Sequence, residues 1–330
     1  MSHELKSRIK FALKIAVAAA LIYFLLHTGL LKVGSLKELL NLQTVAIALI
    51  LVGINLVMLN WRWYWLLKSR GFMVSFGQTF VLYLIGVFFN YALPSSVGGD
   101  VVKAYYLARE QKNRRVEAVL SVLIDRVLGL YSLLMLSLIS VVWDFEFVQS
   151  NPQIRWMAFL CGVLAFVMSV CLLIGFSTRI DRALRITQTL RKIPKFHKIV
   201  EVFEAMQMFG KQRSAIFLSI LVSLVAQTVS IIFFAFVGSA LGAHISFPAY
   251  MFCVPIGFVA MALPIAPAGV GVGQVAFLFL FHAYAKDSGD VGASAITAFQ
   301  LALLVWGLVG AIFYVRYKSP MPLNEIADAS

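Results

Sequence analysis

Hydrophobic side chains occupy this chain in long runs that polar residues rarely interrupt. An α-helix rises about 1.5 Å per residue, so about 20 consecutive apolar residues cross the ~30 Å hydrocarbon layer of a bilayer. The pattern therefore predicts an all-α polytopic membrane protein with six full transmembrane helices. They are expected at residues 11–31, 43–67, 119–142, 155–176, 214–241 and 291–315.

Two further apolar stretches, 77–108 and 249–285, are each broken near the middle by residues that end helices. The first contains ALPSSVGGD at residues 92–100, and the second contains ALPIAPAGVG at residues 262–271. Each limb of the first stretch has about 15 residues, which as helix covers about 23 Å and is short for a full crossing. Non-helical backbone is tolerated at membrane depth only where protein or a watery cavity surrounds it. We expect each stretch to form a re-entrant hairpin of two half-helices that meet at the break.

The positions of the basic residues predict the orientation, because cytoplasmic loops of membrane proteins are rich in Lys and Arg. Of the 28 basic residues, 22 fall in segments on one side of the predicted membrane, and four fall on the other. Arg62 and Arg126 lie within apolar runs. This distribution predicts cytoplasmic termini, a first hairpin that enters from the cytoplasm and a second that enters from outside.

The order of the predicted elements repeats with opposite orientation. Two helices, a hairpin and a helix make up residues 11–142, and the same order makes up residues 155–316. This arrangement is typical of inverted-topology repeats in transporters, whose broken helices meet near the membrane midplane. The alternative is two unrelated Pro/Gly kinks, since the halves share little more than ALP and some glycines. Either way, residues 1–330 are expected to form a single integral membrane domain.

Composition narrows the class further. Hydrophobic residues make up 61% of the chain and charged residues 13%, roughly half the charged share of a soluble protein. The formal net charge of +13 follows the membrane loops, so we expect lipids and no nucleic acid as partners. The three cysteines fall within apolar runs and fit neither a zinc site nor a disulfide framework, and we expect no metal and no cofactor.

Residues 177–213 form a cytoplasmic basic segment, the one sizeable hydrophilic region. Its apolar residues recur at helical spacing, with lysines on the other faces. The pattern predicts an amphipathic helix on the inner leaflet, attracted to anionic headgroups. The alternative is a solvated linker. The apolar positions are Phe196, Ile199, Val200, Phe203 and Met206.

Small, hydroxyl and charged residues cluster at the first break. Two glycines and two hydroxyls before a helix N-terminus can cradle an anion, because free amide groups and the helix dipole point at it. Lys103 adds a positive charge. Asp100 either faces the ligand or caps the returning helix. The cluster comprises Ser95, Ser96, Gly98, Gly99, Asp100 and Lys103.

Asp125 and Arg126 lie about two turns into the apolar run 119–142. A charge deep in a bilayer costs roughly 3 kcal/mol on insertion scales, so such residues usually face the protein interior. Adjacent residues on a helix point about 100° apart, so we expect partners on other helices. Their role is either translocation or a structural ion pair. Arg62, among aromatics, is interpreted as an interfacial residue that extends toward the headgroups, and the alternative is a substrate-binding or translocation residue.

Other polar residues in apolar surroundings add little chemistry. Asn90 on the first broken stretch and Gln274 after the second break are expected to be buried amides. The chain lacks the GxxxxGK[ST] phosphate loop, HExxH and GxSxG motifs, so no ATPase or hydrolase centre is recognisable.

Three motifs together resemble the transmembrane part of lysylphosphatidylglycerol synthases and related flippase-like proteins. They are FFNYALPSSVGGDVVKAYYLARE, SVLIDRVLGL and PIAPAGVGVGQVAFLFLF. The resemblance covers residues 11–316 and implies a multi-pass protein of a bacterial-type cytoplasmic (inner) membrane. Lys103 stands where the family is expected to carry arginine more often. The matching positions are Asn90, Pro94, Gly98, Gly99, Asp100, Lys103, Asp125, Arg126, Pro264, Pro267, Gly269, Gly271 and Gln274.

The function expected from this resemblance is a lipid translocase, not an enzyme. It would move an anionic phospholipid or a polyprenyl-phosphate-linked lipid between leaflets. The synthases carry a large soluble transferase domain after the membrane part, whereas this sequence continues about a dozen residues past Arg316, so we do not expect aminoacyl transfer. The alternatives are a membrane-embedded transferase or accessory subunit, with Asp100 and Asp125 as acid–base groups, and a scaffold of a cell-envelope complex. The lipid, the energy source and the oligomeric state do not follow from the sequence.

Overall fold

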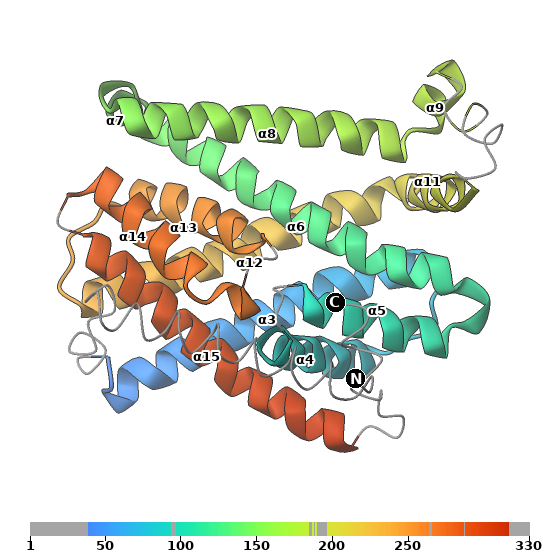
Figure 1. The fold of residues 1–330 in the computed structure, drawn as a ribbon, viewed down its shortest axis with the longest axis horizontal. Coiled ribbons are helices and arrows are strands. Elements are labelled where there is room, and N and C mark those ends of the chain that lie inside the picture. The colour runs from blue at the N-terminus through green and yellow to red at the C-terminus, as the bar shows by residue number, and fades with distance from the viewer. Residues whose placement is uncertain are drawn as a thin grey trace, which may run out of the picture.

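The computed structural model describes residues 39–93, 97–184, 187, 189, 197–263, 266–286 and 288–316, and every regular element within them is helical. The expected all-α fold is therefore confirmed. Figure 1 shows the elements along the chain. They are α3 (Leu42–Ser69), α4 (Phe76–Ala92), α5 (Gly98–Glu110), η1 (Lys112–Arg114), α6 (Arg115–Trp143), α7 (Phe145–Ser150), α8 (Pro152–Phe176), α9 (Thr178–Leu184), α11 (His197–Gly210), α12 (Arg213–Ala240), α13 (Phe247–Met261), η3 (Pro267–Gly269), α14 (Val272–Tyr284) and α15 (Gly289–Arg316).

Within the described residues, six helical stretches are long and apolar enough to cross a membrane. Five of them, α3, α6, α8, α12 and α15, coincide with expected helices, whereas the expected helix 11–31 lies outside the described residues. The sixth, Pro267–Tyr284, belongs to the second broken stretch. It is not a continuous α-helix, because Ala268 has φ 49° inside it. The chain is thus a multi-pass membrane protein.

Local sequence explains where several helices begin and end. Ser75 and Gln78 form a reciprocal capping box at the start of α4, which satisfies two backbone amide groups. The helix ends at Ala92 and Leu93 is extended, as expected for the residue before a proline. Asn151 caps α8, and Pro152 occupies its first turn.

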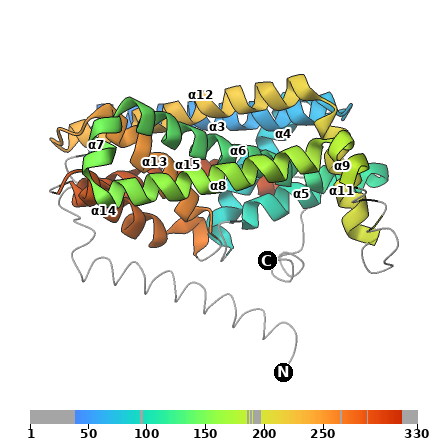
Figure 2. The same ribbon diagram turned by 90° about the horizontal axis from the view of Figure 1, so that it is seen from above.

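Each broken stretch folds as two short helices in contact, α4 with α5 and α13 with α14. The pairs lie toward opposite ends of the bundle, α4–α5 toward the right of Figure 1 and α13–α14 toward the left. Around them, α3 packs against α12, and α15 packs against both α4 and α14. Figure 2 shows α3 and α12 side by side as one layer. That each pair enters and leaves the membrane on the same side stays a prediction, as do the repeat boundaries.

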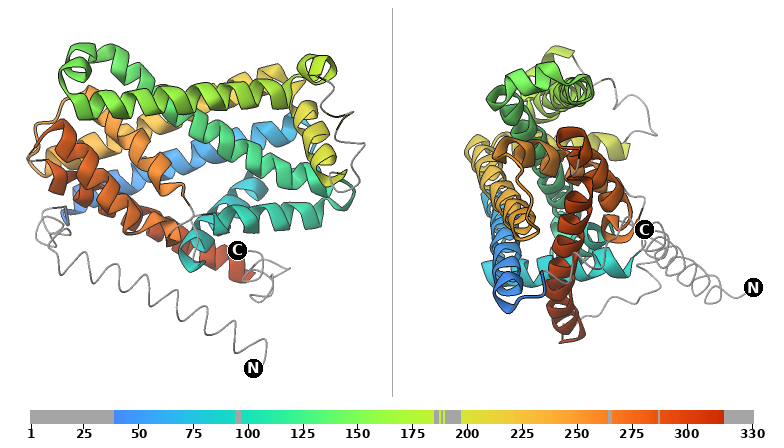
Figure 3. Two further views of the ribbon diagram at one scale, coloured as in Figure 1. Left: turned by 45° about the horizontal axis from the view of Figure 1, so that its top comes forward. Right: turned by 90° about the vertical axis from the view of Figure 1, so that its left-hand side faces the viewer.

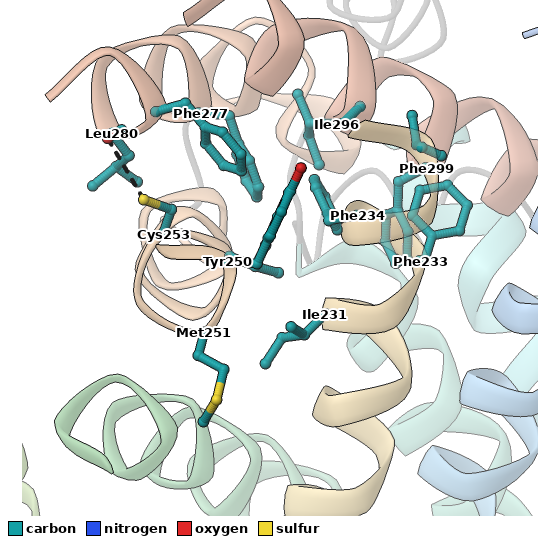
Figure 4. Close-up of a cluster of buried hydrophobic side chains, with 14 of the residues drawn as sticks. Ile231, Phe233, Phe234, Tyr250, Met251, Cys253, Phe277, Leu280, Ile296 and Phe299 are labelled. Atoms are coloured by element: carbon teal, nitrogen blue, oxygen red, sulfur yellow. Dashed lines mark hydrogen bonds between the residues drawn. The ribbon is translucent and has the colours of Figure 1, made fainter. Parts of the chain in front are cut away.

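A cluster of aromatic side chains holds the second broken stretch to the rest of the bundle. Phe234 of α12 stacks on Phe277 of α14 with ring centroids 4.8 Å apart, and Phe299 of α15 lies 5.7 Å from Phe234. Figure 4 shows these rings together with Tyr250 of α13. Lipid tails are as apolar as these side chains, so close packing and not water exclusion stabilises the cluster. Gly257 permits it, because a Cβ there would lie 2.2 Å from the Phe277 ring.

The peripheral helices differ from the buried ones. Figure 3 places α8 along the edge of the bundle, where it contacts α6 and α11. The amphipathic helix expected in 177–213 is present as α11, but Val200 and Phe209 of its apolar face are buried in the protein. Ile199 and Met208 remain exposed. Phe196 lies outside the described residues.

Candidate functional site

Two glycines bring the limbs of the first broken stretch into backbone contact. A Cβ on Gly99 would lie 2.0 Å from the carbonyl oxygen of Gly86, so only glycine fits where α5 crosses α4. The Gly99 amide donates to Asn90 Oδ1 at 2.8 Å. Gly98 is buried against Leu93. One amide of the predicted anion cradle is therefore already bonded within the protein, while Pro94, Ser95 and Ser96 lie outside the described residues.

Asp100 is the centre of a small ionic cluster. Its carboxylate binds Lys103 Nζ at 2.9 Å and Arg126 Nη1 at 2.5 Å. Lys103 also lies over the ring of Tyr83, 4.4 Å from its centroid, and 5.2 Å from that of Trp63. Position 97 is the N-cap of α5 and makes no side-chain capping bond. The capping interpretation of Asp100 is thus wrong, since its side chain pairs with Lys103 of the same helix and with Arg126 of α6.

Arg126 connects the two breaks. One guanidinium nitrogen binds Asp100 in the first turn of α5, and the other donates to the carbonyl oxygen of Ala262 at 2.9 Å. Ala262 ends α13, immediately before the second break. Helix α4 also contacts η3. Stretches that lie about 170 residues apart in the sequence therefore meet around a single cation.

Arg62 and Asp125 form a second, deeper ion pair. The Arg62 Nε–Asp125 Oδ1 distance is 2.6 Å, and Arg62 Nη1 donates to Ser223 Oγ at 2.8 Å. Gly129 makes room, because a Cβ there would lie 2.8 Å from the guanidinium. Arg62 is 4% exposed, so its interpretation as an interfacial residue is wrong. The expected partners of Asp125 and Arg126 on other helices are confirmed.

The second break is organised by amides. Gln274 Oε1 accepts from the Gly271 amide at 2.8 Å, and its Nε2 donates to Gln300 Oε1 at 2.7 Å. Gln300 donates in turn to the Ala268 carbonyl at 3.2 Å. Gly269 (φ 67°) and Gly271 (φ 85°) adopt the left-handed conformation that glycine tolerates. Pro267 opens the 3₁₀ turn, and Pro264 lies outside the described residues.

A cavity of about 260 Å³ lies between the two broken stretches. Asp100 and Lys103 are its charged lining residues, and Ala268 of the second break also borders it. Most of the wall is apolar, and α15 contributes Phe299 and Leu303. Its uncharged polar lining comprises Asn55, Asn90, Tyr83, Tyr91, Gln227 and Ser230. The geometry suits a polar group held among hydrocarbon walls.

The structure brings several of the predicted residues together. Asn90, Gly99, Asp100 and Lys103 line the cavity. Arg126 binds Asp100, and Arg62 with Asp125 lies beside this site, but none of these three residues lines the cavity. Sequence reasoning missed seven polar contributors. Asn55, Gln227 and Gln300 carried a signal, because they are amides in apolar helices. The hydroxyl-bearing residues carried none, because such residues are common in membrane helices; they are Tyr83, Tyr91, Ser223 and Ser230.

Comparison with known proteins identifies the family. The family model for the lysylphosphatidylglycerol synthase transmembrane region matches residues 11–310. The chain belongs to this family. A UPF0104 membrane protein of Methanocaldococcus jannaschii is 26% identical over 278 residues, which cover 78% of this chain and 80% of that protein. A UPF0104 membrane protein of Methanothermobacter thermautotrophicus is 23% identical over 274 residues, with the same coverage. No solved structure matches the chain.

Membership of the lysylphosphatidylglycerol synthase transmembrane family agrees with the resemblance drawn from the three sequence motifs. The matched residues contain both broken stretches, the adjacent residues Asp125 and Arg126, and all of the cavity lining. The site described above thus lies entirely within the family region.

Proposed function

We propose that this chain moves an anionic lipid, a phospholipid or a polyprenyl phosphate, between the two leaflets, and that the central cavity holds its headgroup. The observation that carries the proposal is the charge around Asp100. Three cations, Arg62, Lys103 and Arg126, face two carboxylates, Asp100 and Asp125. One formal positive charge is in excess, and an unmatched charge inside a membrane protein is costly. A ligand anion would supply the missing partner.

The size of the cavity supports a headgroup and not a whole lipid. At about 260 Å³ it lies just below the range of small-molecule pockets, roughly 300–1,000 Å³. A phosphate with its neighbouring polar atoms fits this space, whereas two acyl chains or a prenyl chain do not. The tails therefore stay in the bilayer while the headgroup passes.

Asp100 occupies the place that the ligand anion would take. Its carboxylate and a phosphate are both acceptors for Arg126 and Lys103 through charge-assisted hydrogen bonds. In the proposed mechanism the phosphate competes with Asp100 for these two cations. The Gly99 amide joins the site only when Asn90 releases it.

The architecture of the proposed translocase is an inverted repeat, residues 11–142 and 155–316, with two re-entrant hairpins. The meeting of the two breaks at Arg126 supports it, because transporter sites lie where discontinuous helices of two repeats meet. We further propose a cytoplasmic (inner) membrane location with both termini in the cytoplasm. The charge distribution of the sequence supports this orientation.

The alternative, a membrane-embedded transferase or accessory subunit, is less well supported. It requires Asp100 or Asp125 to exchange protons with a substrate. Both carboxylates instead form short ion pairs with arginine, at 2.5 and 2.6 Å. Groups held in this way act as fixed anions, so the arrangement favours binding over acid–base catalysis.

The experiment compares lipids in proteoliposomes. Fluorescent phosphatidylglycerol and phosphatidylcholine with identical chains are followed by dithionite quenching, which reports movement between leaflets. We expect wild type to move phosphatidylglycerol faster, and Lys103→Gln and Arg126→Gln to slow it by about tenfold, the effect of roughly one lost charge-assisted hydrogen bond. Arg70→Gln is the matched control, because Arg70 pairs with Glu117 outside the cavity. Equal rates for both lipids in wild type would refute the proposal.

A further inference from the structure

A second and larger cavity lies at the edge of the bundle, away from the site described above. It measures about 570 Å³ and is bounded by the C-terminal half of α8, by α6 and by the first turns of α12. None of its lining residues borders the central cavity. Figure 1 shows the C-terminal end of α8 next to α11, which it contacts.

Three cations border the polar end of this cavity: Arg179, Lys211 and Arg213. Among the residues that the structure describes, their side chains form no ion pair or hydrogen bond. Arg62, Arg70, Lys103, Arg114 and Arg126, in contrast, are each paired with a carboxylate. Three exposed, unpaired cations from two segments, α9 and the turn that opens α12, therefore surround one cavity, and together they attract an anion.

The rest of the cavity wall suits hydrocarbon. Leu128, Leu172 and Ile220 line it, and Phe217 at 70% exposure and Leu173 at 61% form its outer edge toward the surrounding lipid. The hydroxyl groups of Ser169 and Tyr131, 3.1 Å apart, lie between these walls. The cavity therefore offers positive charge at one end, hydroxyl groups along its wall and apolar surface that opens sideways.

We propose that this cavity binds one anionic phospholipid. Its phosphate contacts Arg179, Lys211 and Arg213, and an acyl chain lies between α8 and the α6–α12 pair. Charge complementarity selects the headgroup, and the length of the apolar wall requires a tail, so free phosphate is not the ligand. The bound lipid fills the space under α8 and fastens this peripheral helix to the bundle. This inference does not depend on the proposed translocation.

The test is native mass spectrometry of the full chain, with palmitoyl-oleoyl phosphatidylglycerol and the matching phosphatidylcholine as probes. We expect wild type to retain phosphatidylglycerol in preference to phosphatidylcholine, and Lys211→Gln/Arg213→Gln to weaken phosphatidylglycerol binding by about tenfold or more. Arg109→Gln/Arg115→Gln is the matched control, because it removes two exposed cations that do not line the cavity. Glycerol 3-phosphate at millimolar concentration should not displace the lipid.

Two further variants separate this site from the central one. Leu172→Trp fills the cavity without changing its charge and should also weaken phosphatidylglycerol binding, whereas Arg126→Gln should leave this bound lipid in place. Equal retention of the two phospholipids by wild type would overturn the proposal. Equal losses in the Lys211/Arg213 double variant and its control, or displacement by glycerol 3-phosphate, would also overturn it. Melting temperatures in lipid-free detergent show whether any variant is misfolded, and the cavity-filling variant then decides the outcome.

Discussion

Removing the negative charge of Asp125 should destabilise the fold more than any other single charge change in the site. Asp125→Asn keeps the size of the side chain but leaves the Arg62 guanidinium without a counter-ion, with Ser223 as its remaining side-chain partner. Both side chains of the pair are almost fully buried, at 5% and 4% exposure. The attraction between unit charges about 4 Å apart is about 4 kcal/mol at an effective dielectric constant of 20. Breaking a buried pair typically costs about 3–5 kcal/mol.

The Asp100–Arg126 pair provides the comparison. Its side chains are each 22% exposed, and Asp100 keeps Lys103 as a second partner. Solvent screens such a pair, so Arg126→Gln should cost about 1 kcal/mol. Thermal unfolding in detergent, followed by size-exclusion chromatography, measures both variants. We expect a fall in melting temperature for Asp125→Asn that is several times the fall for Arg126→Gln.

A neutral double variant tests the cause. Arg62→Gln/Asp125→Asn removes both charges, so it should recover much of the stability that Asp125→Asn loses, because no buried charge is left unpaired. If Asp125→Asn has the same melting temperature as the wild type, the ion pair contributes nothing to stability. If the double variant is less stable than either single variant, the loss comes from packing and not from charge. Either result would refute the reasoning.

Three other predictions concern the two breaks. Gly99→Ala forces a Cβ to within 2.0 Å of a backbone oxygen of α4 and should lower the free energy of unfolding by about 3 kcal/mol, whereas Gly77→Ala, with open space around it, should change it by less than about 1 kcal/mol. Gln274→Leu leaves Gln300 Oε1 of α15 without its donor and should cost about 1–3 kcal/mol in the same melting assay; the isosteric Gln274→Glu lacks the same donor and should share the loss, whereas it would melt at the wild-type temperature if side-chain size alone mattered. In a chain without its native cysteines, single cysteines at Ser95 and Leu263 should react with polar thiol reagents from opposite sides of the membrane, and labelling from one side would exclude the inverted repeat.

The helical architecture could be predicted from the sequence because bilayer thickness fixes the length of a spanning run. The breaks could be located for a similar reason, since proline and glycine leave few backbone options. The sequence could not show which charged side chains pair with each other across helices. Arg62 lies among tryptophans, a pattern typical of interfaces, yet its charge is matched by Asp125 on another helix. A one-dimensional pattern contains no information on which face of α3 meets α6.

The same limit applies to the first break. Glycines beside a helix start indicated free amide groups, but the structure shows that Gly99 serves close helix contact and donates to Asn90. Glycine has both uses, and only the neighbouring chain distinguishes them. The sequence also did not reveal the ion pairs of Asp100 with Lys103 and Arg126, because a carboxylate near the start of a helix commonly caps it.

The two bonds of Arg126 are unequal, and this inequality sets an order of events. Any movement that parts the breaks must release either the carboxylate of Asp100 or the carbonyl of Ala262. Both bonds have a charged donor, but only the bond to Asp100 also has a charged acceptor, so the carbonyl is the weaker partner and is expected to leave first. A hydrogen bond to a charged group contributes about 1.5–3 kcal/mol net, so breaking this bond costs about that much. The end of α13 is therefore expected to part from Arg126 before α5 and α6 separate, and these two helices stay joined until another anion competes for the guanidinium.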